Sequence, residues 1–273
     1  MHPILFTAFG VELRSYPFFL ALAAAIGILG CIWYSNKRGF AVRPVIVVLA
    51  AASVAVLVGA RLMNAALNWG FYSAHPEEIW TLTTVGFSLY GGILLAALVG
   101  VAACRALKID VWKLGDTFAP FIGLSIAIVR IGCFLNGCCF GTETDLPWGV
   151  TFPFLSPAHR YQMSHGISGL FSVAPVHPTE LYELAAAFVG AALAMIVVKR
   201  RPFDGAAILA FAMWFTAFRF FDDFLRVPSE SFRAPAYFYP ILYLVVFVAT
   251  GCIFRRRWIH SVRRDSRPTP PVK

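Results

Sequence analysis

Charge is what this sequence has least of. Only 14% of its 273 residues are Asp, Glu, Lys or Arg, whereas 59% are hydrophobic. A soluble domain carries about 25% charged residues, because its surface must be hydrated. This chain has too little charge to cover a surface that faces water, so we expect it to lie partly in lipid.

Two further patterns are missing. The apolar runs do not alternate between polar and apolar residues, which excludes a transmembrane β-barrel. None of the six cysteines belongs to a C-x-x-C pair, so zinc and redox signatures are weak. Because backbone groups in lipid must be hydrogen-bonded within their own segment, the apolar runs are expected to be helices.

Seven apolar runs are each long enough to cross about 30 Å of hydrocarbon as a helix. We place them at about 17–34, 43–67, 84–105, 117–137, 178–198, 205–225 and 236–254. Most Lys and Arg residues outside these runs lie after the first, third and fifth runs and in the tail. The positive-inside rule therefore predicts a cytoplasmic C-terminus and, with seven spans, an N-terminus outside.

The sequence thus predicts an all-α polytopic membrane protein with about seven transmembrane helices. Residues 1–258 are expected to form a single transmembrane domain. Residues 138–177, between the fourth and fifth runs, contain aromatic residues such as Trp148 and Phe152, which predict a small ordered cap on the outer side. The basic, Pro-rich tail at 259–273 is predicted to be disordered.

Three arginines lie within or at the outer end of predicted spans: Arg61, Arg130 and Arg219. A charge inside a span costs roughly 2.5–3.5 kcal/mol on insertion scales, so each is expected to have a purpose. Guanidinium groups match phosphate and carboxylate, which favours a shared anion site. The alternative is ion pairing within the helices, and Asp222 and Asp223 follow Arg219 at helical spacing.

Two motifs accompany the arginines. Arg130-Ile-Gly-Cys-Phe-Leu-Asn-Gly137 predicts a helix that ends in glycine-rich backbone, where Asn136 and Gly137 either bind a ligand or pack helices closely. His177-Pro-Thr-Glu-Leu-Tyr-Glu183 opens the fifth run. A buried Glu183 can pair with an arginine or move a proton, and His177 can act as a base or a simple helix cap.

Two other groups of residues allow more than one interpretation. Ser88-Leu-Tyr-Gly-Gly92 begins the third run, and its glycine pair permits close approach of either a ligand or a helix. Three cysteines lie close together in the sequence at Cys133, Cys138 and Cys139. They could supply a nucleophile, a metal site or a disulfide, but we interpret them as small packing residues and expect neither a metal nor a cofactor.

Taken in order, these motifs resemble the prolipoprotein diacylglyceryl transferases of bacterial inner membranes. Further motifs that carry the resemblance are Gly59-Ala-Arg61, Asp116-Thr-Phe-Ala-Pro120 and Ala217-Phe-Arg219 with the following acids and Arg226. The resemblance covers about residues 10–255. It implies transfer of the diacylglyceryl group of phosphatidylglycerol to the lipobox cysteine of a preprolipoprotein signal peptide, with glycerol phosphate leaving.

The resemblance also implies roles for individual residues. The catalytic candidates are Arg130, Arg219, Tyr90, Glu183 and His177. The substrate-binding candidates are Arg61, Gly91, Gly92, Asn136, Gly137, Tyr182 and Arg226. Expected partners are phosphatidylglycerol, preprolipoprotein signal peptides and membrane lipid, with no nucleic acid. The expected location is the bacterial inner membrane, with the active site toward the outer leaflet.

The chain departs from better-known members at four positions. It has Tyr90 where they carry His, Phe215 where they carry Tyr, Cys133 where they usually carry Asn and Cys138 where they carry Glu. A paralogous transferase with another acceptor or lipid therefore stays open. So do a non-catalytic anionic-lipid-binding protein or transporter and thiol redox exchange by the cysteines.

Overall fold

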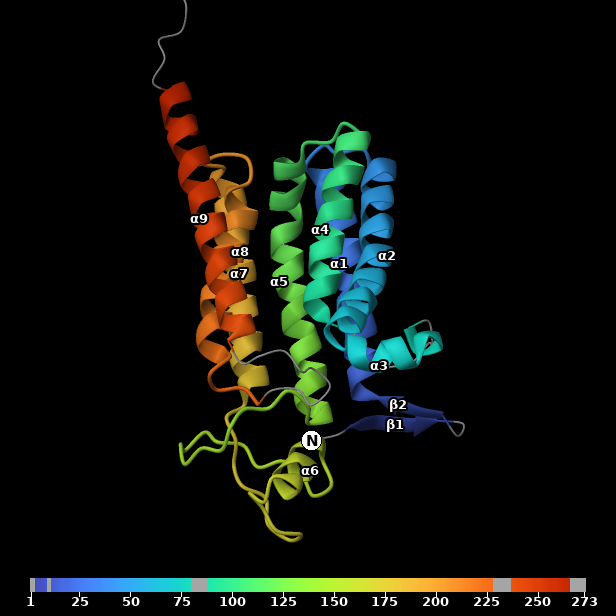
Figure 1. Cartoon of the computed structure of the whole chain (residues 1–273). Coiled ribbons are helices and arrows are strands. Elements are labelled where there is room, and N and C mark those ends of the chain that lie inside the picture. The colour runs from blue at the N-terminus through green and yellow to red at the C-terminus, as the bar shows by residue number, and fades with distance from the viewer. Residues whose placement is uncertain (1–2, 9–10, 80–87, 228–236, 266–273) are drawn as a thin grey trace, which may run out of the picture. The chain divides into compact units, whose positions relative to one another are not determined.

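The computed structural model is mostly helical and describes residues 3–8, 11–79, 88–227 and 237–265 (Figure 1). It contains two compact units, which are described separately. Unit 1 comprises Met1–Gly27, Gly115–Val227 and Tyr239–Lys273, and unit 2 comprises Ile28–Leu114 and Pro228–Phe238. Helix α1 (Ser15–Lys37) contributes residues to both units.

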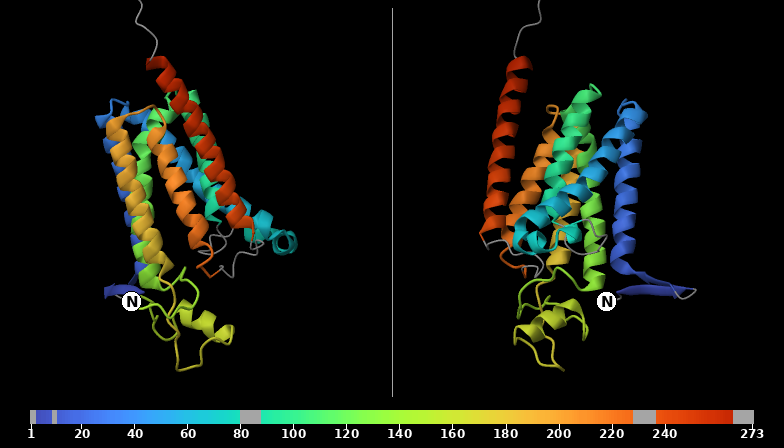
Figure 2. Two further views of the ribbon diagram at one scale, coloured as in Figure 1. Left: turned by 90° about the vertical axis from the view of Figure 1, so that its left-hand side faces the viewer. Right: turned by 45° about the vertical axis from the view of Figure 1, so that its right-hand side comes forward.

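Unit 1 contains the N-terminal hairpin and the second half of the chain. Strands β1 (Ile4–Ala8) and β2 (Val11–Arg14) pair antiparallel and lead directly into α1. The helices that follow are α5 (Val111–Asn136), α6 (Pro157–Ser164), α7 (Thr179–Arg200), α8 (Ala206–Asp222) and α9 (Phe238–Asp265). Helices α7, α8 and α9 lie side by side, and α6 lies beyond the end of α5 (Figures 1 and 2).

Small residues bring α5, α7 and α8 together. A Cβ atom added to Gly123 would lie 2.9 Å from the carbonyl oxygen of Ala187 and 2.8 Å from the ring of Phe211. The three helices therefore approach closely at this glycine, which is how apolar helices pack in lipid. Near the start of α5, Asp116 accepts backbone hydrogen bonds from Gly205, Ala207 and Ile208 at the start of α8.

The segment between α5 and α7 has a small core of its own. Phe140, Phe152, Ala158 and Val176 are buried there together. Val176 forms isolated bridges with both Glu143 and Val150, which tie the two ends of the segment to each other. The predicted ordering of residues 138–177 therefore has a physical basis in this aromatic core.

Unit 2 is built on the pair formed by α2 (Val42–Leu67) and α4 (Leu89–Ala106). Between them lie the short helix α3 (Trp69–Ala74) and the 3₁₀ helix η1 (Pro76–Ile79). Gly59 on α2 faces Gly91 on α4, and a Cβ on either would collide with the carbonyl oxygen of the other. Gly92 is similarly close to the backbone of Val56.

Each of the seven predicted runs coincides with one long helix: α1, α2, α4, α5, α7, α8 and α9. Five of them, α1, α2, α5, α7 and α9, are long and apolar enough to cross a membrane. The chain is thus a multi-pass membrane protein. The described part of α4, Tyr90–Ala106, is shorter, and α8 ends at Asp222 because the chain then turns to pair with residues 140–142.

The start of the third predicted span and the start of the predicted disordered tail differ from the described helices or lie outside them. The prediction that the tail is disordered from residue 259 is wrong for its first turns, because α9 continues to Asp265. Good helix formers, including Arg255, Arg256 and Arg257, carry this helix onward, and positive side chains near its C-terminus favour the helix dipole. The predicted start of the third span and the tail after 265 lie outside the described residues.

Candidate active site

A single carboxylate in unit 1 is shared by three arginines. Glu183, in the first turns of α7, is only 2% exposed. Its Oε1 accepts a hydrogen bond from Nη2 of Arg130 on α5 at 2.6 Å. Its Oε2 accepts hydrogen bonds from Nη1 of Arg219 on α8 at 3.1 Å and from Nη1 of Arg226 at 2.9 Å. Three elements thus place guanidinium groups around one buried anion, which we call the arginine cluster.

Arg219 is the most completely held of the three. Its Nη1 also donates to Oδ2 of Asp222 at 2.7 Å, and its Nη2 donates to the hydroxyl of Tyr243 on α9 at 3.0 Å. Oδ1 of Asp223 lies 3.9 Å from its Nη2. The sequence allowed two interpretations of this arginine, ion pairing within α8 and a shared anion site. Each interpretation describes part of its surroundings.

Arg130 has one N–H donor without a partner among the described residues. Its Nη1 donates to the sulfur of Cys133 at 3.6 Å, which is a weak contact. Its Nε is buried and has no hydrogen-bond partner among the described residues. A buried donor left unpaired costs about 1–3 kcal/mol. An oxyanion beside Arg130 would satisfy this donor and add negative charge where guanidinium groups converge.

Backbone pairing holds the elements of the site together. Gly141 donates its N–H to the carbonyl of His177 at 2.9 Å, and Thr142 donates to that of Leu225 at 2.8 Å. Gly141 is also bridged to Arg226. A Cβ at Gly141 would lie 2.6 Å from both the Cβ of His177 and the carbonyl oxygen of Leu225, so only glycine fits this crossing.

His177 and Tyr182 form a second polar group at the start of α7. The Tyr182 hydroxyl lies 3.3 Å from Nδ1 of His177 and accepts a hydrogen bond from Nε1 of Trp148 at 2.8 Å. Both side chains are half-buried. The pair therefore connects the arginine cluster's helix to the folded segment that precedes it, and the tyrosine hydroxyl can fix the orientation of the imidazole.

Asn136 and Gly137 lie where α5 ends. Gly137 has a φ of +72°, the left-handed conformation that commonly terminates helices. Both residues line a hollow of about 320 Å³, together with Phe152 and Arg160 among others. These two predicted ligand-binding residues therefore line a hollow in unit 1. The arginines of the cluster are not among the residues that line it.

The remaining predicted residues belong to unit 2. Arg61 is buried, and its Nε donates to the carbonyl of Ile79 at 2.8 Å while its Nη2 donates to that of Glu78. Its guanidinium also lies 5.8 Å from the ring centre of Tyr72. Tyr90 is half-buried in the first turn of α4. The close contact with α2 accounts for Gly91 and Gly92 as packing residues, and their role with substrate stays a prediction.

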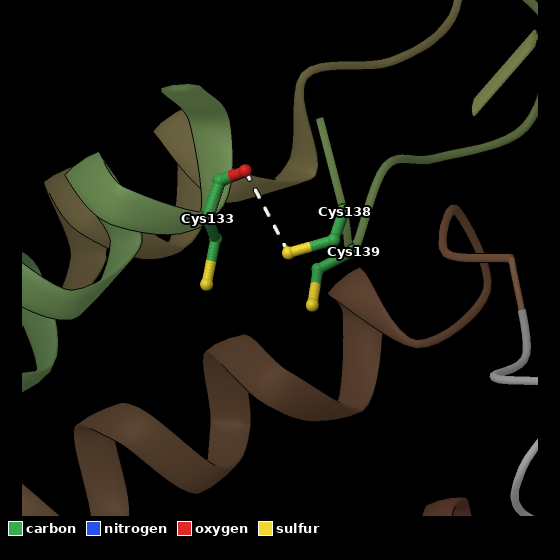
Figure 3. A group of neighbouring side chains, drawn as sticks. All are labelled: Cys133, Cys138 and Cys139. Carbon is green, nitrogen blue, oxygen red and sulfur yellow. Dashed lines mark hydrogen bonds between the residues drawn. The ribbon is translucent and has the colours of Figure 1, made fainter. Parts of the chain in front are cut away.

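The three clustered cysteines come together in space. The sulfur atoms of Cys133, Cys138 and Cys139 all lie within 4.8 Å of one another (Figure 3). Hydrogen bonds from the other two thiols hold the pKa of Cys139 below its ordinary value. The sequence showed that these cysteines are close in the chain but not that their sulfur atoms converge, because a five-residue spacing does not align side chains on a straight helix. Sequence reasoning also missed Tyr243, which no motif marks.

Comparison of the sequence with known proteins identifies the family. The sequence model of the family "Prolipoprotein diacylglyceryl transferase" matches residues 3–256. The chain belongs to this family. The resemblance inferred from the motifs is therefore confirmed, and it extends over nearly the whole chain.

Three relatives, each named phosphatidylglycerol–prolipoprotein diacylglyceryl transferase, illustrate the similarity. The protein from Geobacter sulfurreducens is 30% identical over 236 residues, which cover 84% of each chain. That from Finegoldia magna is 29% identical over 230 residues, covering 84% of this chain and 85% of the relative. That from Listeria innocua is 26% identical over 259 residues, covering 94% and 90%.

Proposed function

We propose that this protein transfers the diacylglyceryl group of phosphatidylglycerol to the lipobox cysteine of preprolipoproteins, the first step of bacterial lipoprotein maturation. The observation that carries this proposal is the arginine cluster. Three guanidinium groups share the carboxylate of Glu183, and Nε of Arg130 is a buried donor without a partner among the described residues. An anionic phospholipid supplies the phosphate oxygens that such a site binds.

The membrane arrangement is part of the proposal. All seven long helices cross the bacterial inner membrane, α4 and α8 joining the five that meet the length and hydropathy of a span. The distribution of Lys and Arg supports an outer N-terminus and a cytoplasmic tail. The arginine cluster and residues 138–177 then face the outer leaflet, and residues 1–258 act as a single transmembrane domain.

The reaction joins a sulfur to a carbon and releases a phosphate ester. The acceptor thiol loses its proton, and the thiolate attacks the glycerol carbon that carries the phosphate. The carbon–oxygen bond breaks with both electrons going to oxygen, so glycerol phosphate leaves with increased negative charge. Arg130, Arg219 and Arg226 stabilise that charge as it develops, which is where fixed cations are most effective.

We assign His177 as the group that accepts the thiol proton. The carboxylate of Glu183 already accepts three charge-assisted hydrogen bonds, so its role is to hold the arginines in place. A phenol oxygen is a weaker proton acceptor than an imidazole nitrogen, which favours His177 over Tyr90. The imidazole of His177 can accept a proton, and the hydroxyl of Tyr182, 3.3 Å from its Nδ1, orients it.

Other predicted substrate-binding residues have different roles in the proposal. Arg226 has the geometry for direct contact with phosphate, because its guanidinium already reaches Glu183. Asn136 and Gly137 contact substrate from the hollow at the end of α5. Arg61, Gly91 and Gly92 maintain unit 2, where they join η1 and α4 to α2.

A transfer assay tests the proposal. The purified protein in detergent receives phosphatidylglycerol labelled in its head group and a lipobox peptide. We expect thioether-linked diacylglyceryl peptide and an equal amount of released glycerol phosphate. Arg130→Ala and Arg219→Ala are expected to lower the rate by at least about 100-fold, since each removes a donor to the developing charge.

The matched control is Arg14→Ala, which removes an exposed arginine from strand β2 and should leave the rate unchanged. A peptide with serine in place of the lipobox cysteine should give no product. If the parent protein binds phosphatidylglycerol yet forms no product beside an active relative, the chain is an anionic-lipid-binding protein and the proposed transfer is wrong. If product formed from another phospholipid, the donor assigned in this proposal would be wrong.

A further inference from the structure

We propose that Cys133, Cys138 and Cys139 form a binding site for a thiophilic metal ion, Cu(I) or Zn(II), through their three sulfur atoms. The three sulfurs already lie within 4.8 Å of one another (Figure 3). A metal–sulfur bond of about 2.3 Å requires sulfur–sulfur separations of roughly 3.8–4.0 Å in tetrahedral or trigonal sites. Small side-chain rotations therefore suffice to bring all three onto one ion.

Backbone contacts help to place the three cysteines, and the thiol of Cys138 also donates to the carbonyl of Cys133 at 3.7 Å (Figure 3). Helix α5 ends after Cys133, and the left-handed turn at Gly137 reverses the chain so that the N–H of Cys138 donates to the carbonyl of Cys133 at 3.2 Å. The hydroxyl of Thr179 on α7 donates to the carbonyl of Cys139 at 2.8 Å. The ligand set is thus held by the fold before any ion binds, as in preorganised metal sites.

The surroundings suit a metal thiolate centre. Three thiolates leave a net negative charge on either ion, and Nη1 of Arg130 donates to the sulfur of Cys133 at 3.6 Å. Such a hydrogen bond stabilises a coordinated thiolate. Glu180 follows Thr179, is only 1% exposed, and has no partner for either carboxylate oxygen among the described residues. A buried carboxylate without a partner is costly, and a nearby cation would offset that cost.

Ligand chemistry selects the class of ion. Sulfur ligands bind soft ions such as Cu(I) and Zn(II) and discriminate against Mg²⁺ and Ca²⁺. Three thiolates alone suit three-coordinate Cu(I), whereas Zn(II) adds a fourth ligand, such as water. The other three cysteines are not comparable, because Cys31, Cys104 and Cys252 each lie singly, and all six thiols are free.

The test is metal titration of the full-length, reduced protein under nitrogen. Cd²⁺, Co²⁺ and Cu(I) are added separately, and sulfur-to-metal charge-transfer absorption and bound metal per chain are measured. We expect one ion per chain and at least a 100-fold loss of affinity in each of Cys133→Ser, Cys138→Ser and Cys139→Ser. The matched control is Cys252→Ser, an exposed cysteine on α9, which should bind as the parent does.

Protection of the thiols gives a readout that does not depend on the variants folding. In the parent protein, a bound ion should slow alkylation of all three cysteines together and leave Cys252 unaffected. The proposal is wrong if the reduced protein shows no stoichiometric binding, or if oxidation to a disulfide is the only change these thiols undergo. Metal binding without transfer activity would contradict the proposed function alone, and transfer activity without metal binding would contradict this site alone.

Discussion

The two ends of helix α5 each lie beside a buried carboxylate, and the two carboxylates are held in different ways. Near its start, Asp116 accepts backbone N–H groups from Gly205, Ala207 and Ile208 at 2.7, 2.8 and 3.0 Å. Near its end, Arg130 reaches Glu183, whose side-chain donors in the described part of the chain are all arginines. One carboxylate is stabilised by backbone N–H dipoles and the other by charged side chains.

This difference separates a structural site from a reactive one. The donors to Asp116 are the first N–H groups of α8, which have no partner within that helix, so the carboxylate acts as a cap across two helices. The donors to Glu183 belong to three elements, and the buried Nε of Arg130, which has no partner among the described residues, can donate to a phosphate. The Asp116 end therefore maintains the packing of α5 and α8, and the Glu183 end can accept a ligand.

The largest effect is expected from Glu183→Gln at the reactive end. An amide cannot neutralise three guanidinium groups, and removing one partner of a buried ion pair costs about 3–5 kcal/mol. We expect the rate of transfer to fall at least about 100-fold, because the arginines lose their common anchor. Rates and thermal unfolding in detergent measure both effects. A variant that keeps half of the parent's rate would show that the arginines do not need Glu183.

A smaller, purely structural effect is expected from Asp116→Asn. The amide keeps the shape but weakens its hydrogen bonds to the start of α8, which should lower the free energy of unfolding by about 1–3 kcal/mol. The rate per folded molecule should stay within about twofold, because the site chemistry lies at the other end of α5. Loss of activity without loss of stability would overturn the contrast between the two ends.

The smallest effect is expected from Tyr182→Phe. This change removes the hydroxyl that accepts from Trp148 and lies 3.3 Å from Nδ1 of His177, and it leaves the arginine cluster intact. We expect the rate to fall by about tenfold or less, since a general base contributes about 10²–10⁴-fold and here is only misoriented. The pH profile should change while the apparent affinity for phosphatidylglycerol does not. An unchanged profile would remove His177 from the proposed mechanism.

The sequence motifs contain several of the residues that form this site. The arginine of the fourth run and the carboxylate of the fifth were both marked by sequence patterns, and α5 and α7 bring them to 2.6 Å. Sequence spacing also marked Asp222 as a partner of Arg219, which the 2.7 Å contact confirms. Tyr243 could not be predicted, because it contacts Arg219 from another helix and no sequence motif surrounds it.

The sequence by itself determined that the chain lies in a membrane and where its long helices run, because the transfer of apolar residues into lipid is a local property. Only the tertiary structure decided which buried charges meet. Arg130 and Glu183 lie 53 residues apart, and Arg226 and Glu183 lie 43 apart. Pairing at such separations depends on how helices pack, which composition does not encode. The same holds for the three cysteines, whose meeting depends on the turn at Gly137.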